Sequence, residues 1–212
     1  MKKITALLLI SVMIFALCSC SGKAPQKATN TDATATDARE VETKSTLDIE
    51  REAVPNAAVI YFSHNDVIKE AAEFAAGVRG CDLIEIVPKE AYPDDATELA
   101  QRIKEEKENN VRPALKDQPK NLDDYDILFV GFPVWENTMP MPLYTFLEDY
   151  DMMNKAIIPF CYSPDGKFGE SLNDMAELCR YGAIVSCHTL TDGDFEPEKP
   201  IFEGWMDQVL FS

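Results

Sequence analysis

The clearest chemistry in this sequence lies in the loop of residues 133–139, which reads Pro-Val-Trp-Glu-Asn-Thr-Met. An apolar run, Ile127–Gly131, precedes it and is too short for a helix, as is typical of a parallel strand covered on both faces. Trp135 would then stand at a strand end, where its large π surface could stack against a planar ring. The alternative is that the indole folds inward as part of the core. The loop therefore predicts either a ring-binding site or a core tryptophan.

The first loop along the chain, residues 63–68, follows the apolar run Ala57–Phe62 and opens a helical pattern. The free N–H groups at a helix amino terminus bind anions such as phosphate, and a protonated His64 would add positive charge. Asp66 works against an anion, because a carboxylate repels it. As an N-cap or first-turn acid, Asp66 could instead bind those amides itself and occupy the anion site. The sequence leaves both readings of this loop open.

A third loop, Tyr162–Phe168, contains the turn signal Pro164-Asp165-Gly166. Tyr162 could close over a bound ring or lie on the surface beside the turn. Lys167 is expected to offset local acidic charge.

Five apolar runs of strand length alternate with five helical patterns. The strands are predicted at Ala57–Phe62, Leu83–Val87, Ile127–Gly131, Lys155–Cys161 and Gly182–Cys187, and the helices at Asp66–Val78, Asp95–Asn110, from Pro142, Gly169–Cys179 and Glu198–Leu210. This alternation predicts a doubly wound α/β fold with a five-stranded parallel sheet and right-handed crossovers. Ligands of such sheets bind at the carboxyl ends of the strands, where the strand order reverses. The three loops would meet there.

Several motifs occur in a fixed order along these elements. They are Tyr61-Phe62-Ser63, Gly131-Phe132-Pro133-Val134-Trp135, Met139-Pro140-Met141-Pro142, Thr145-Phe146-Leu147-Glu148, and Ile157-Ile158-Pro159-Phe160-Cys161 with Phe168-Gly169. Together they resemble the flavodoxins over nearly all of residues 54–210. The resemblance implies a sheet in the order 2-1-3-4-5, a non-covalently bound FMN, and electron transfer as the chemistry.

The same resemblance implies which residues hold the cofactor. They are Ser63, His64, Asn65, Val67, Ile68, Pro133, Val134, Trp135, Glu136, Asn137, Thr138, Tyr162, Asp165 and Gly166. The first loop departs from the Ser-x-Thr-Gly-Asn-Thr pattern of similar proteins, because only Ser63 keeps its hydroxyl. Asn137 stands where relatives often carry glycine and tolerates a left-handed backbone. Glu136 replaces a second aromatic residue.

The amino terminus predicts export. Residues 1–19 are interpreted as a signal peptide, because two lysines precede an apolar stretch that is shorter than the roughly 20 residues of a membrane span. Leu17-Cys18-Ser19-Cys20 resembles the lipobox of bacterial lipoproteins, with Cys20 as the lipidated residue; an ordinary signal peptide is the alternative. Residues 20–53 hold few large apolar side chains and predict a disordered tether. Residues 54–212 are predicted to form one flavodoxin-like domain, anchored to a membrane surface through the lipid alone.

Charge and cysteine content narrow the functions further. The net charge of −17 argues against nucleic-acid binding, since a phosphate backbone would be repelled. Export permits disulfides, but free core thiols are favoured for Cys81, Cys161, Cys179 and Cys187. Cys187 and His188 adjoin only in sequence, so they are not predicted to be a catalytic pair.

Two functions remain at this stage. The first is an FMN-binding protein that passes electrons to an unidentified redox protein or small-molecule acceptor, or acts as a small flavin-dependent reductase; the flavin carries the reaction, so no catalytic side chain is predicted. Carboxylates at Asp66, Glu136 and Asp165 would disfavour the anionic reduced flavin. The second is a degenerate flavodoxin fold that no longer binds FMN and serves as a binding or scaffold lipoprotein.

Overall fold

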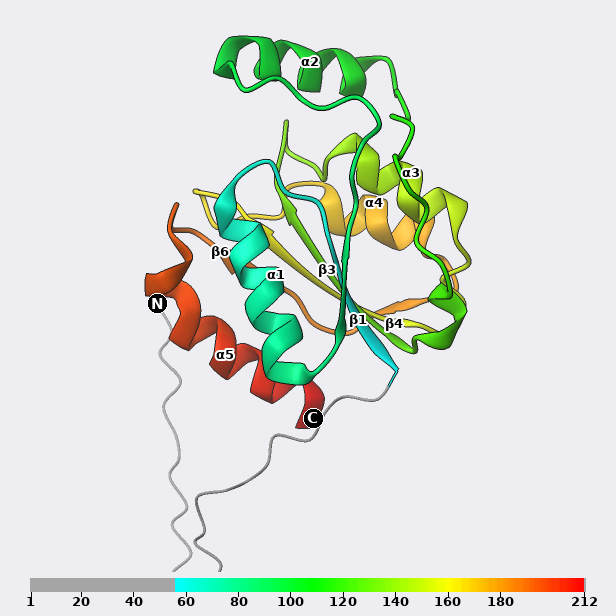
Figure 1. Ribbon diagram of the computed structural model, residues 1–212, viewed down its shortest axis with the longest axis vertical. Coiled ribbons are helices and arrows are strands. Elements are labelled where there is room, and N and C mark those ends of the chain that lie inside the picture. The colour runs from blue at the N-terminus through cyan, green and yellow to red at the C-terminus, as the bar shows by residue number, and fades with distance from the viewer. Residues whose placement is uncertain (1–55, 212) are drawn as a thin grey trace, which may run out of the picture. The chain divides into compact units, whose positions relative to one another are not determined.

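The computed structural model describes residues 56–211 (Figure 1). Its sheet is parallel throughout, in the order β2-β1-β3-β4-β5, with a sixth short strand also paired to β4. The strands are β1 (Ala57–Tyr61), β2 (Asp82–Glu85), β3 (Ile127–Pro133), β4 (Ala156–Tyr162), β5 (Ala183–Ile184) and β6 (His188–Leu190). The predicted fold class and strand order are confirmed. The predicted signal peptide, tether and lipidated Cys20 lie outside the described residues.

The fifth strand position differs from the prediction, because two short strands replace the single strand predicted at Gly182–Cys187. The pairing offset along β4 changes by one residue between Ile157↔Ile184 and Phe160↔His188, as in a β-bulge. The bulge turns His188 toward α5, where its ring stacks on Trp205 with centroids 5.0 Å apart. Burial lowers the pKa of His188, which fits a packed ring rather than a catalytic base.

The helices are α1 (Asp66–Arg79), α2 (Ala96–Glu108), α3 (Met141–Asp149), α4 (Ser171–Leu178) and α5 (Phe195–Phe211). Helices α1 and α5 cover one face of the sheet, and α3 and α4 cover the other (Figure 1). Helix α5 begins at Phe195, three residues before the start predicted at Glu198. Pro197 then falls in the first turn, where its missing N–H group costs little.

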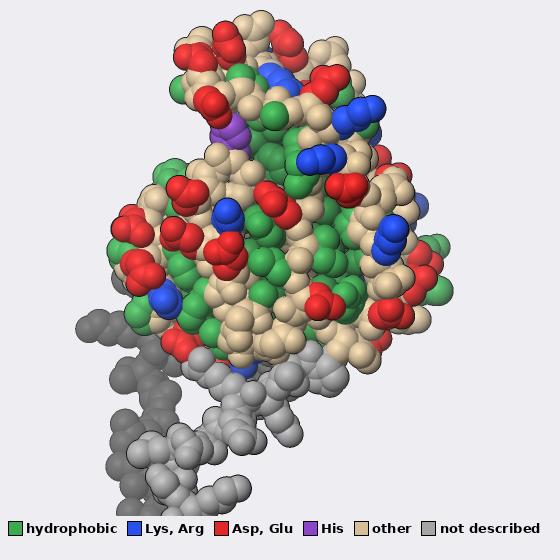
Figure 2. Space-filling view, viewed as in Figure 1, with side chains coloured by type: hydrophobic (Ala, Val, Ile, Leu, Met, Phe, Trp, Pro, Cys, Tyr) green, Lys and Arg blue, Asp and Glu red, His purple; other side chains and the backbone are tan. Residues whose placement is uncertain are grey.

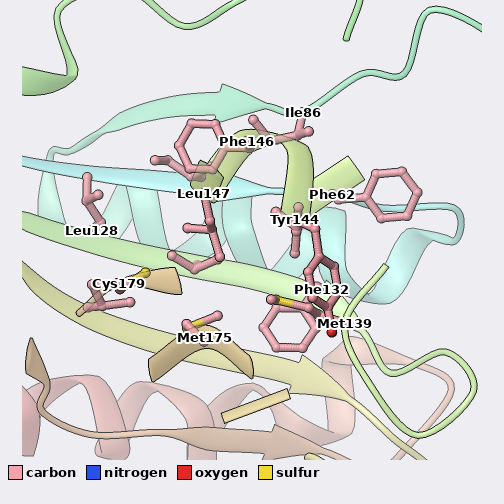
Figure 3. Packing of buried hydrophobic residues seen from close by; sticks show 14 of the residues in the cluster. Phe62, Ile86, Leu128, Phe132, Met139, Tyr144, Phe146, Leu147, Met175 and Cys179 are labelled. Atoms are coloured by element: carbon pink, nitrogen blue, oxygen red, sulfur yellow. The ribbon is translucent and has the colours of Figure 1, made fainter. Parts of the chain in front are cut away.

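The two faces of β3 contribute to separate cores. Leu128, Val130 and Phe132 belong to the core that also contains side chains of α3 and α4, and Figure 3 shows Leu128 and Phe132 in this core. Phe129 points the opposite way, toward α1 and α5. Gly131 leaves room for the Phe160 ring, since a Cβ there would lie 2.6 Å from Phe160 Cε2. Both faces of the central strand are therefore closely packed, as the unbroken apolar run predicts.

Helix α2 covers neither face of the sheet. Figure 1 shows it beyond the edge where the strands end. Asp95 caps it by accepting hydrogen bonds from the amides of Thr97 and Glu98, at 2.9 and 3.0 Å. Glu106 is its buried residue. The predicted solvent-facing helix is thus present, and its position places it above the loops at the carboxyl ends of the strands.

The four cysteines of the domain are free thiols, as predicted, but only Cys161 and Cys179 are buried in the core. Burial raises the pKa of Cys161 and of Cys179 to about 12, and that of Cys81 to about 11. Cys187 is exposed. Because the thiolate is the reactive species, we expect maleimide at pH 8 to label Cys187 well before the other three. Peptide mapping after short labelling times checks this, and equal labelling of Cys161 would contradict the described packing.

Two features are absent from residues 56–211. No helix in this range combines the length and the apolar character that crossing a bilayer requires. The same residues bring together no group of three or more His, Cys, Asp or Glu side chains that could hold a metal ion.

Candidate functional site

The amino terminus of α1 is open to a ligand. Its N-cap residue, Asn65, has an extended backbone and makes no side-chain capping hydrogen bond. Asp66 is exposed in the first turn, and among residues 56–211 its carboxylate makes no hydrogen bond or ion pair. The structure therefore does not support the hypothesis that Asp66 caps its own helix. Ser63 instead donates its hydroxyl hydrogen to the Asn65 carbonyl. The first-turn N–H groups of α1 are left for an external acceptor.

A cavity of about 360 Å³ lies beside this helix end. It separates the first loop from the segment that follows β2. Its walls are formed by Phe62, Ser63, His64, Asn65, Asp66, Lys69, Glu85, Ile86, Val87, Pro88, Ala91, Tyr92 and Asp94. Figure 2 shows hydrophobic side chains exposed in the narrow region of the surface below α2. The cavity thus combines an apolar wall with a helix amino terminus, one lysine and several carboxylates.

Trp135 lies in a cluster of aromatic rings next to the cavity. Its indole meets the rings of Phe62, His64 and Tyr92 edge to face, with centroids 5.2, 5.9 and 5.0 Å away. The indole is half-buried and packs against the core that includes Phe62. Trp135 is therefore neither a fully exposed ring-binding residue nor a fully buried core residue. One side of the indole is fixed by neighbouring rings, and part of it stays accessible.

A tight turn at the tip of the β3–α3 loop holds Trp135. Glu136 and Asn137 both have positive φ, 44° and 65°, as the two central residues of a type I′ turn require. Trp135 and Thr138 exchange two backbone hydrogen bonds across it, at 2.8 and 2.9 Å. Lys107 of α2 donates to the Glu136 carbonyl at 2.5 Å. The left-handed backbone expected for Asn137 is present, and it serves to close the turn.

Thr138 belongs to a buried polar network instead of facing the cavity. Its hydroxyl lies 2.8 Å from the Tyr144 hydroxyl and donates to Asp174 at 2.5 Å. Tyr144 also donates to Asp174. Burial, followed by the hydrogen bond to Asp174, raises the pKa of Tyr144 well above its ordinary value. The network joins the β3–α3 loop to α3 and α4, so the Thr138 side chain is occupied inside the protein.

The third loop lies apart from the cavity. Tyr162 packs with the α1 and α5 core, and its carbonyl accepts a hydrogen bond from the Val134 amide at 2.9 Å. Asp165 accepts hydrogen bonds from Ser163 at 2.6 Å and from Lys167, and these partners hold its pKa below the ordinary value. Gly166 takes the positive φ of the turn. The loop is ordered by its own contacts.

The predicted site residues therefore divide into two groups. Ser63, His64 and Asn65 line the cavity, Trp135 lies beside it, and Val67 and Ile68 can contribute only backbone N–H groups, because their side chains are buried in the core. The others do not line the cavity: Pro133, Val134, Glu136, Asn137, Thr138, Tyr162, Asp165 and Gly166. Of the three predicted carboxylates, only Asp66 lies there.

Sequence reasoning missed Lys69 and Tyr92, which both line the cavity. Lys69 could have been found from its place one helical turn after Asn65 and Asp66. Tyr92 gives no such signal, because it lies in an irregular segment between β2 and α2.

Comparisons with known proteins place this geometry in a family. The flavodoxin sequence profile matches residues 56–199. A crystal structure of a protein assigned as a flavoprotein from Bacteroides eggerthii is similar, with a TM-score of 0.64 and 25% identity over 75% of this chain and 100% of that chain. A crystal structure of a similar protein from Bacteroides uniformis has a TM-score of 0.64 and 25% identity, over 72% of this chain and 98% of that chain.

A flavoprotein of Lactobacillus acidophilus in complex with FMN shares the fold, with a TM-score of 0.56 and 18% identity over 69% of this chain and 98% of that chain. Comparison with curated proteins gives no match. Since the family profile covers more than half of the sequence, the chain belongs to the flavodoxin family.

Proposed function

We propose that this protein binds FMN and transfers electrons. One observation carries the proposal: the uncapped amino terminus of α1 borders a cavity that adjoins the Trp135 ring cluster. A phosphate needs free N–H groups, and a planar ring needs an apolar aromatic surface. The two requirements are met by neighbouring parts of one strand-end region, where ligands of doubly wound sheets bind.

The residues around the cavity would hold the two ends of the cofactor. Backbone N–H groups of Asp66, Val67 and Ile68 would bind the phosphate, with Lys69 supplying a nearby positive charge. Trp135 would offer its accessible side to the flavin ring. When bound, FMN supplies the electron-accepting and electron-donating chemistry. The protein orients the ring and limits its contact with water.

The charge around the cavity bears on the potential of the flavin. Asp66, Glu85 and Asp94 line the cavity with Lys69. Net negative charge near the ring disfavours an anionic reduced form and lowers the reduction potential. The same charge favours basic redox proteins or neutral acceptors as partners.

Titration with FMN tests the proposal. We expect flavin fluorescence to be quenched on binding and a yellow chromophore to stay with the protein after desalting. Absence of binding at micromolar FMN would overturn the proposal. That result would favour the alternative of a flavodoxin fold that serves as a binding or scaffold protein.

Asp66→Asn is expected to strengthen FMN binding about fivefold, which corresponds to about 1 kcal/mol of relieved repulsion. The effect should shrink as salt is added, because Asp66 is exposed. Glu70→Gln is the matched control, since Glu70 is also exposed on the first half of α1 but does not line the cavity. Equal FMN dissociation constants for the wild type and Asp66→Asn would mean that the phosphate does not bind at this helix end.

We further propose that Cys20 carries a lipid that anchors the exported protein to a membrane surface. The support is the lipobox-like Leu17-Cys18-Ser19-Cys20 behind an apolar stretch. Cys20→Ser is expected to move the protein from the membrane fraction to the soluble fraction and to abolish palmitate labelling, whereas Cys18→Ser should do neither. Membrane association unchanged in Cys20→Ser would argue for a different anchor.

A further inference from the structure

Tyr92 connects the Trp135 cluster to α2. Its side chain is only 8% exposed, and its ring centroid lies 5.0 Å from that of Trp135 and 5.8 Å from that of Phe62, both edge to face. The other end of the side chain donates a hydrogen bond to the Glu106 carboxylate at 2.5 Å. Tyr92 therefore contacts the cavity, the indole and the helix above them at once.

The Glu106 carboxylate is held from two sides. Arg102 donates to it at 2.9 Å, and the guanidinium carbon of Arg102 lies 4.1 Å from the centre of the Tyr92 ring. Arg102 also donates to the carbonyls of Ala91 and Glu90, at 2.7 and 3.2 Å. These contacts fix the backbone directly before Tyr92 as well as its ring. Tyr92, Arg102 and Glu106 form one hydrogen-bonded unit.

This unit is unusual for a helix that is otherwise polar. Glu106 is the buried residue of α2, with 8% of its surface exposed. A buried carboxylate is costly unless donors surround it, and here Tyr92 and Arg102 supply them. Removing the Tyr92 hydroxyl leaves the carboxylate short of one donor, so the ring and the helix both lose their fixed position. The next ring in contact is the indole of Trp135.

We propose that Tyr92 is a positioning residue, held by Glu106 and Arg102 of α2, that fixes the Trp135 indole in the orientation in which it stacks on the flavin. This inference rests on the proposed function, because it names a determinant of the same site. If Tyr92 has this role, the flavin affinity and the reduction potential of the flavin depend on α2, a helix that does not itself line the cavity.

The test uses the full-length chain with Trp205→Phe, so that Trp135 is the single tryptophan. Tyr92→Phe keeps the ring and removes the hydroxyl. We expect the near-ultraviolet circular dichroism band of Trp135 to weaken, FMN binding to weaken about fivefold, and the midpoint potential of bound flavin to shift. Glu106→Leu should have the same effects, and adding Tyr92→Phe to Glu106→Leu should change little more.

Tyr150→Phe is the matched control, because the Tyr150 hydroxyl donates to the Pro119 carbonyl at 2.7 Å, outside the Trp135 cluster. It should leave the Trp135 band and the potential as they are. An unchanged Trp135 band in Tyr92→Phe, or additive effects of Tyr92→Phe and Glu106→Leu, would overturn the positioning role. If the wild type binds no FMN, the proposed function fails, and the Trp135 band alone decides whether Tyr92 holds the indole.

Discussion

Trp135→Leu is expected to weaken FMN binding by about 10- to 100-fold, because stacking of a heterocycle on an aromatic side chain contributes about 1–3 kcal/mol. Leucine keeps an apolar contact with Phe62 and Tyr92 but offers no π surface. Titration followed by flavin fluorescence measures the change. The absorption spectrum of any flavin still bound should also lose the shift that stacking produces.

The control for this variant is Trp205→Leu, which removes the other tryptophan of the chain. Trp205 stacks on His188 and donates to the Ser186 hydroxyl at 3.0 Å, on the α5 side of the sheet. Its loss should lower the free energy of unfolding and leave the FMN dissociation constant unchanged. Similar FMN affinities for wild type and Trp135→Leu would place the ring elsewhere on the protein.

Gly169→Ala is expected to lower the free energy of unfolding by about 3 kcal/mol and to disturb the loop that holds Trp135. Gly169 has a φ of +58°, and an added Cβ would lie 2.7 Å from the carbonyl carbon of Asn137. The same carbonyl accepts the Glu170 amide at 2.7 Å, so it cannot move away without losing that bond. Urea denaturation and FMN titration measure the two effects.

Gly166→Ala separates backbone strain from the steric clash. Gly166 has a similar φ of +71°, but an added Cβ would meet only Thr191 Cγ2, at an ordinary 3.6 Å. We expect a loss of about 1 kcal/mol, the cost of a left-handed backbone at a residue with a Cβ. Gly166 lies in the third loop, away from the cavity, so FMN affinity should be unaffected. Equal losses for the two variants would mean that the Asn137 contact adds nothing.

The layers of the fold were predictable, because the spacing of apolar residues along the sequence indicates which segments are strands and which are helices. The runs at Ala57–Phe62 and Ile127–Gly131 are buried strands, and the strand order follows from the alternation with helices together with the family resemblance. The bulge before His188 was not predictable, since a single extra residue leaves the composition of the run unchanged. The predicted start of α5 at Glu198 was too late. A proline is allowed in the first turn of a helix, so Pro197 does not mark the helix boundary.

The site was only partly predictable, because its walls come from segments far apart in the chain. The first loop and Trp135 follow strands and could be placed at one edge. Tyr92 could not, since an irregular segment fixes it through contacts with Glu106 and Arg102. Thr138 and Tyr162 lie near the expected edge in sequence, yet the side chain of each points into the protein. Side-chain direction in a loop depends on tertiary neighbours that local pattern does not encode.

The direction of the strands has a practical consequence. All strands of the sheet run the same way, so Ala57, Ile127 and Ala156 begin side by side at the edge remote from the cavity. A group attached directly at residue 56 would be connected at that remote edge. A partner fused directly to residue 56 would thus leave the mouth of the cavity accessible to freely diffusing reactants.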